Sequence, residues 1–66
     1  MKTLYEDSSV KVGAKVIILS SRYTRSFAGR TGTLVSKGFD LVGVQFDKGA
    51  PKSKYFSKTD VAVLER

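Results

Sequence analysis

The sequence predicts an all-β domain of five short antiparallel strands in meander order. Apolar and polar residues alternate with period two in several segments, which is the pattern of half-buried strands. No window of eleven residues has a helical period, and β-branched residues and glycines, which favour strands and turns, dominate. Because five strands in a chain of 66 residues cannot form two broad sheets, we expect them to bend into a small, partly open barrel.

The first strand is expected near the start of the regular pattern. Apolar residues occupy the even positions of VKVGAKVIIL, from Val10 to Ile18. Gly13 is typical of a turn or bulge, so the main strand starts near Ala14. Residues 1–9 show no period and are expected to form a flexible tail or an edge strand. The domain itself therefore covers residues 10–66.

Four more strands are expected after a long loop. The second is RTGTLVSK, in which Gly32 allows close backbone approach or sharp bending. The third, LVGVQFD, has the clearest alternation, with Val42, Val44 and Phe46 on one face. KYFS and VAVLE complete the set, and the turns are GFD, KGAPKS and KTD. Phe39, in the first of these turns, either is exposed or plugs one end of the barrel. The expected core consists of Val16, Ile18, Leu34, Val42, Val44 and Phe46.

The loop SSRYTRSFAGRTG is the longest connection and the most basic one. It holds three arginines, two aromatic residues and two glycines, and it has no acidic residue. Most hairpin loops have about two to five residues, so a longer loop in a small domain either closes a flap or binds a ligand. We expect Phe27 to fold back as a lid that covers Ile17 or Leu19. For Tyr23, packing and ligand binding remain equal alternatives.

The net charge of +6 and the isoelectric point near 9.9 indicate a polyanionic partner. Nucleic acid is the first expectation, an acidic protein the second and an anionic membrane the third. Alternate loops of an antiparallel meander lie at the same end, so loop 20–30 and loop 48–53 are expected to share one end. Basic residues collect there, and arginines and aromatic residues together suit phosphates and bases. The expected nucleic-acid-binding residues are Arg22, Tyr23, Arg25, Arg30, Lys48, Lys52, Lys54 and Tyr55.

The opposite end is expected to be electrically balanced. Loops 38–40 and 58–60 meet there, with Lys37 and Lys58 beside Asp40 and Asp60. The two aspartates are typical turn residues, because an Asp side chain bonds its own nearby backbone.

No catalytic group of residues is found in the sequence. The chain has no histidine and no cysteine, and its six acidic residues are scattered, so we expect no enzyme activity, no metal site and no cofactor. AGRTG lacks the pattern of a phosphate-binding loop. The absence of a long apolar run and of a signal-peptide core predicts a cytoplasmic protein without a membrane span.

The segments VGAKVIIL, AGRTGTLV, VGVQF and YFSKTDVAVLE resemble the small SH3-like barrels, and among them the KOW type. Val16 and Ile18 match the first strand of that family, and Gly29 and Gly32, followed by Leu34, match its glycine turn. The resemblance covers residues 10–65 and departs from a compact KOW unit in the longer first loop. It implies binding to nucleic acid or to the transcription and translation machinery.

Two other small barrels look similar. The SH3-like subunit of photosystem I has a similar length and ending, and it docks on acidic partners. The type II dihydrofolate reductases also end in a segment like VAVLER, but their V-Q-I-Y segment is replaced here by KSKYFSK. The first function expected is therefore a non-catalytic, nucleic-acid-binding module with a role in transcription. The alternatives are docking on an acidic polymerase, ribosomal or photosynthetic partner, and an enzyme subunit that needs oligomerisation.

Overall fold

The computed structural model describes residues 1–65 and contains five strands and one short 3-10 helix. The all-β class is confirmed, and each strand lies within two residues of its expected position. Residue 66 of the expected domain lies outside the described residues. The elements are β1 (Lys15–Ile18), β2 (Thr31–Lys37), β3 (Leu41–Phe46), β4 (Ser53–Ser57), η1 (Lys58–Asp60) and β5 (Val61–Glu65).

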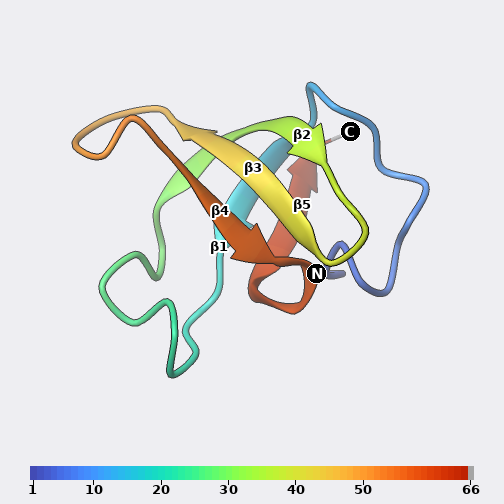
Figure 1. Cartoon of the computed structure of the whole chain (residues 1–66), viewed down its shortest axis with the longest axis horizontal. Coiled ribbons are helices and arrows are strands. Elements are labelled where there is room, and N and C mark those ends of the chain that lie inside the picture. Colours follow the sequence, from blue (N-terminus) through green and yellow to red (C-terminus); the bar gives the residue numbers. More distant parts are fainter. Residues whose placement is uncertain (66) are drawn as a thin grey trace.

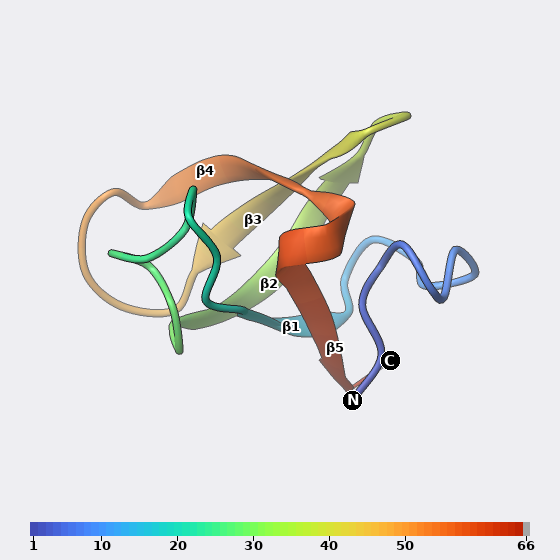
Figure 2. The same ribbon diagram turned by 90° about the horizontal axis from the view of Figure 1, so that it is seen from below.

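The strands form one antiparallel sheet in the order β4-β3-β2-β1-β5 (Figure 1). Strands β1 to β4 form a meander as expected, but β5 pairs with β1 rather than β4. The reason is that η1 carries the chain across the sheet, where Leu19 N donates to Asp60 O at 2.8 Å. Within residues 1–65, β4 and β5 do not pair, so the sheet is open and the expected barrel is not closed (Figure 2).

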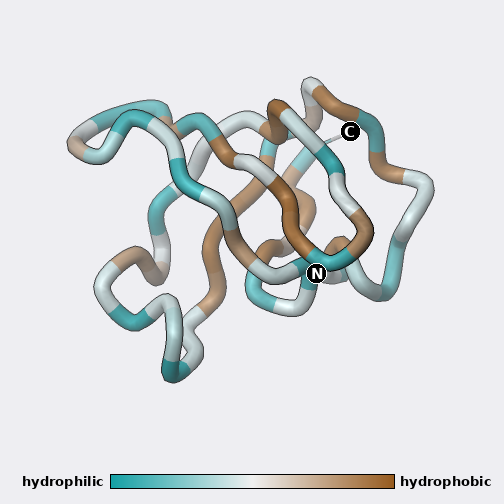
Figure 3. The backbone as a smooth tube through the Cα atoms, viewed as in Figure 1, coloured by the Kyte–Doolittle hydropathy of each residue, from teal (hydrophilic) through white to brown (hydrophobic). Residues whose placement is uncertain are grey.

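The core lies on the concave side of this bent sheet. All six residues expected in it are buried, and Val16, Leu34, Val42 and Val44 have no exposed surface. A bulge at Val35 bends β2 against β3. Figure 3 shows hydrophobic residues along the central strands, whereas many residues of the loops are hydrophilic. The core is completed by Leu4, Val10, Ala14, Phe56, Val61 and Ala62.

Residues 2–4 lie along the outer edge of β5, and the chain then leads to Ser8 beside Lys37. Leu4 is buried, and its amide donates to Val61 O at 2.9 Å. The Lys37 ammonium group donates to Ser8 O at 2.8 Å and fastens the segment to β2. The segment forms one isolated bridge, between Thr3 and Ala62, and not the edge strand that the sequence offered as the alternative to a flexible tail. The segment therefore covers an edge that would otherwise expose unpaired backbone groups.

Candidate nucleic-acid interface

The long first loop folds into a compact flap. At its base, Ile18 O accepts from Gly29 N at 2.8 Å, and Ile18 N donates to Arg30 O at 2.9 Å. Gly29 has a φ of +86°, a conformation that favours glycine. Inside the loop, the buried hydroxyl group of Thr24 donates to Leu19 O at 2.5 Å. These hydrogen bonds close the loop at its base and brace its backbone from within.

Phe27 anchors this flap to the sheet. Its ring is half-buried and lies 5.8 Å from the Phe46 ring, in a parallel arrangement, and 5.7 Å from the Phe56 ring, edge to face. The expectation of a lid is confirmed. The rings that it contacts lie on β3 and β4, however, whereas the sequence placed it over Ile17 or Leu19. The loop leans across the sheet toward β4, where Tyr23 and Thr24 lie beside residues 54–57.

The loops meet at two ends of the sheet, as the meander predicts. The Arg30 guanidinium group donates to Lys48 O at 2.6 Å and to Ala50 O at 3.1 Å, which joins the first loop to the third. At the opposite end, Lys58 N donates to Asp40 O at 3.2 Å and joins η1 to the turn at residues 38–40. In Figure 1 the first and third loops both project to the left of the sheet.

Arg30 has an internal role at the first of these ends. Besides its two hydrogen bonds, its guanidinium carbon lies 3.9 Å from the centre of the Phe46 ring. Planar stacking of this kind, together with a forked donor, is specific to arginine. Arg30 therefore connects the flap, the third loop and the core, and its expected contact with phosphate stays a prediction.

We expect Arg30→Ala to lower the free energy of unfolding by about 1 to 2 kcal/mol, because it removes a cation–π contact and two hydrogen bonds to carbonyl groups. Arg30→Lys should recover only part of this loss, since an ammonium group cannot reproduce the fork. Urea denaturation of the three proteins measures the difference. Equal stability of Arg30→Ala and the parent would contradict the internal role.

Five further cations at this end are exposed, and we call them the basic end. Within residues 1–65, none of them forms an ion pair. The acidic residue that follows β3, Asp47, is already engaged: Lys15 donates to its carboxylate, and Thr31 Oγ1 donates to the same oxygen at 2.9 Å. These hydrogen bonds, the one from Lys15 first, hold the pKa of Asp47 below its usual value. The basic end consists of Arg22, Arg25, Lys48, Lys52 and Lys54.

Tyr23 and Tyr55 lie beside the basic end. They are 80% and 67% exposed, yet both line one shallow depression of about 230 Å³. Lys54 lines it too, with its ammonium nitrogen 5.6 Å from the Phe27 ring. The sequence gave no signal for the other lining residues, because they come together only when the flap leans over β4. These residues are Thr24, Leu41, Phe56, Ser57 and Asp60.

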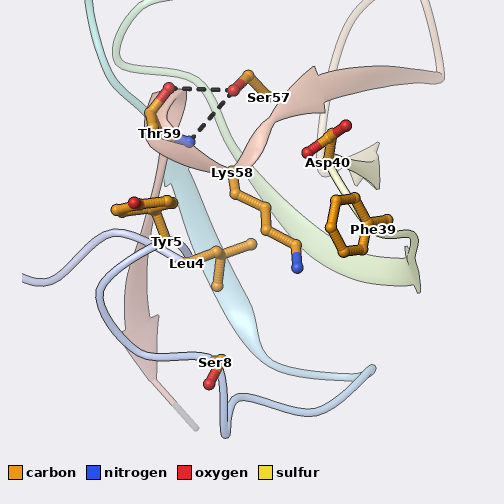
Figure 4. A pocket seen from close by; sticks show the side chains of 8 residues that line it. All are labelled: Leu4, Tyr5, Ser8, Phe39, Asp40, Ser57, Lys58 and Thr59. Carbon is orange, nitrogen blue, oxygen red and sulfur yellow. Dashed lines mark hydrogen bonds between the residues drawn. The ribbon is translucent and has the colours of Figure 1, made fainter.

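A larger cavity of about 530 Å³ lies at the opposite end. Figure 4 shows the Lys58 side chain extending between Tyr5 and Phe39. Phe39 is 92% exposed, so it does not plug the sheet. Lys58 and Asp40 both line the cavity, so this end carries charges of both signs. The sequence could not predict this cavity, since part of its wall is the folded N-terminal segment.

Comparisons of the chain with protein-family models, curated proteins and solved structures found no match. In the part of the chain that the structure describes, no three acidic, histidine or cysteine residues cluster as metal ligands would. No helix among residues 1–65 has the length and apolar content needed to cross a membrane.

Proposed function

We propose that this protein is a non-catalytic module that binds nucleic acid through the basic end. The observation that carries this proposal is the asymmetry of charge. Five exposed cations gather around the first and third loops without an ion-pair partner among residues 1–65, and Asp47 is paired with Lys15. Unpaired cations on a protein neutralise the phosphates of a nucleic acid on binding, and the counterions of those phosphates are released. A role in solubility alone would not require the cations to share one end.

We further propose that the domain is an open relative of the small SH3-like barrels of the KOW type. Support comes from the order of its parts. A glycine turn, Gly29 to Gly32, leads into β2, and a single 3-10 turn precedes the last strand. This relationship would suit a module that works with the transcription or translation machinery.

The salt dependence of binding tests the proposal. If all five residues of the basic end contact phosphates, the log–log slope should be about −4.5 on duplex DNA and about −3.5 on single strands. Replacing Arg22 and Arg25 together by alanine should reduce the magnitude of the slope by about 1.4 to 1.8 on these substrates. The measurement is a titration of random-sequence DNA and RNA with the full chain between low and moderate salt.

The matched control removes the same charge elsewhere. Lys11 and Lys58 lie outside the basic end, and changing both to alanine should leave the slope nearly unchanged. Lys37 is unsuitable as a control, because it holds the N-terminal segment. Equal weakening by the two double variants would contradict binding at one end. Retention on an acidic protein after nuclease treatment, with no binding to DNA or RNA, would favour the protein-docking alternative.

A further inference from the structure

The depression beside the basic end is formed by two tyrosines from distant parts of the chain. Tyr23 comes from the flap and Tyr55 from β4, and both are mostly exposed. Rings exposed to this degree contribute little to the core, in contrast to Phe27, Phe46 and Phe56, which contact one another. The Tyr55 ring lies near Gly43, on the face of β4 opposite to Phe56. Two exposed aromatic residues at one depression would suit a ligand with an apolar face.

Strand β4 leaves room for such a ligand, because it is an edge of the sheet. Its ladder with β3 begins at Lys52 O, which accepts from Phe46 N at 2.7 Å. Since hydrogen-bonded pairs alternate along an antiparallel ladder, Lys54 and Phe56 direct their backbone groups to β3. The N–H and C=O groups of Tyr55 therefore face outward. A ligand stacked on the Tyr55 ring would find a donor and an acceptor within the same edge.

We propose that the basic end binds single-stranded nucleic acid, and that Tyr23 and Tyr55 stack on its bases. The inference rests on the proposed function and adds the class of ligand. In a duplex the faces of the bases are covered by their neighbours, whereas an unpaired base can stack on an aromatic side chain. Lys54 and Asp60 both line the same depression as the tyrosines. Lys54 offers a cation to a phosphate next to a stacked base, and repulsion by the Asp60 carboxylate directs that phosphate to the Lys54 side.

Binding of four matched probes by the full chain tests this inference. They are a mixed-sequence DNA strand of about twelve nucleotides, the RNA of the same sequence, the corresponding DNA duplex, and the DNA strand with abasic sites. Fluorescence anisotropy at one ionic strength should show the intact strands binding at least about 10-fold more tightly than the duplex or the abasic strand. Stacking of one base corresponds to roughly 5- to 150-fold in affinity.

Variants then assign the effect to the rings. Tyr23→Leu and Tyr55→Leu should each weaken binding of the intact strands by at least about 5-fold. They should leave the salt slope unchanged, because no charge is lost. Tyr23→Phe and Tyr55→Phe keep the ring and should bind like the parent. Since both side chains are exposed, all four variants should melt at the parent temperature.

The outcomes separate the two levels of the proposal. Salt-dependent binding that favours the duplex, or leucine variants that bind like the parent, would overturn the single-strand inference and retain the nucleic-acid module. No binding to any of the four probes would overturn both. Equal affinity for the intact and abasic strands would show that phosphates alone are recognised, and it would also overturn stacking.

Discussion

Phe46→Ala should lower the free energy of unfolding by about 3 to 5 kcal/mol. Phe46 is only 7% exposed, and its ring contacts the Phe27 and Phe56 rings at 5.8 Å each, with Arg30 above it. Truncation would leave a cavity beneath the flap and remove the surface on which Phe27 rests. A domain of 66 residues has about 3 to 10 kcal/mol of stability in all. The variant should therefore lose about a third or more of its stability, and it should be largely unfolded at room temperature if the parent lies at the lower end of this range.

Phe39→Ala provides the matched control, because it deletes the same side chain at a site that is 92% exposed. Its urea midpoint should lie close to that of the parent. Circular dichroism during urea titration of the three proteins measures both effects. If Phe46→Ala unfolded at the parent midpoint, or if Phe39→Ala were equally destabilised, the assignment of the core face would be wrong.

Gly32→Ala should cost about 3 kcal/mol, at the upper end of the range for overpacked cores. Gly32 lies in the middle of the sheet, paired with Val16 on β1 and with Phe46 on β3. An added Cβ would overlap the backbone oxygen of Gln45 and come within 2.8 Å of Val44 Cγ1. Because the obstacle is backbone, it cannot rotate away, and β2 and β3 would have to separate. Thermal melting of the variant measures the loss.

Gly43→Ala is the control for this change. Its Cβ would first meet Ser36 Oγ at 2.5 Å and then Tyr55 Cε1 at 3.3 Å. Both are side-chain atoms that can move by rotation about a bond, so the cost should be below about 1 kcal/mol. Comparable losses at Gly32 and Gly43 would show that the close approach of β2 to β3 at Gly32 does not set the cost of the substitution.

The two glycines show how far local sequence information reaches. A glycine within RTGTLVSK predicts either close backbone approach or sharp bending at Gly32, and the structure shows the close approach. The sequence does not say which strand approaches, because the partner, Gln45, is thirteen residues away. The same holds for the flap. The length and basic character of the flap are evident from the sequence. The hydrogen bonds that close it, from Gly29 and Arg30 to Ile18, depend on the register between β1 and the end of the loop.

Among the expected binding residues, the structure distinguishes roles that the sequence treats alike. Arg30 has the same chemistry as Arg22 and Arg25, yet only Arg30 lies against the Phe46 ring and two loop carbonyl groups. A side chain's direction is set by its place on the folded backbone, not by its type. For this reason the number of cations available to a ligand could be estimated only after folding.

The sequence by itself determined the all-β class, the strand positions and the six buried residues, because a period of two is a local property of the chain. It also determined which loops share an end, since antiparallel neighbours reverse direction at each turn. Only the tertiary structure decided that β5 pairs with β1, that the sheet stays open and that residues 2–4 cover an edge. Only it brought Tyr23 and Tyr55 to one depression. These features depend on contacts between residues far apart in the chain. Packing of the whole core selects which residues meet, and no local pattern in the sequence encodes that choice.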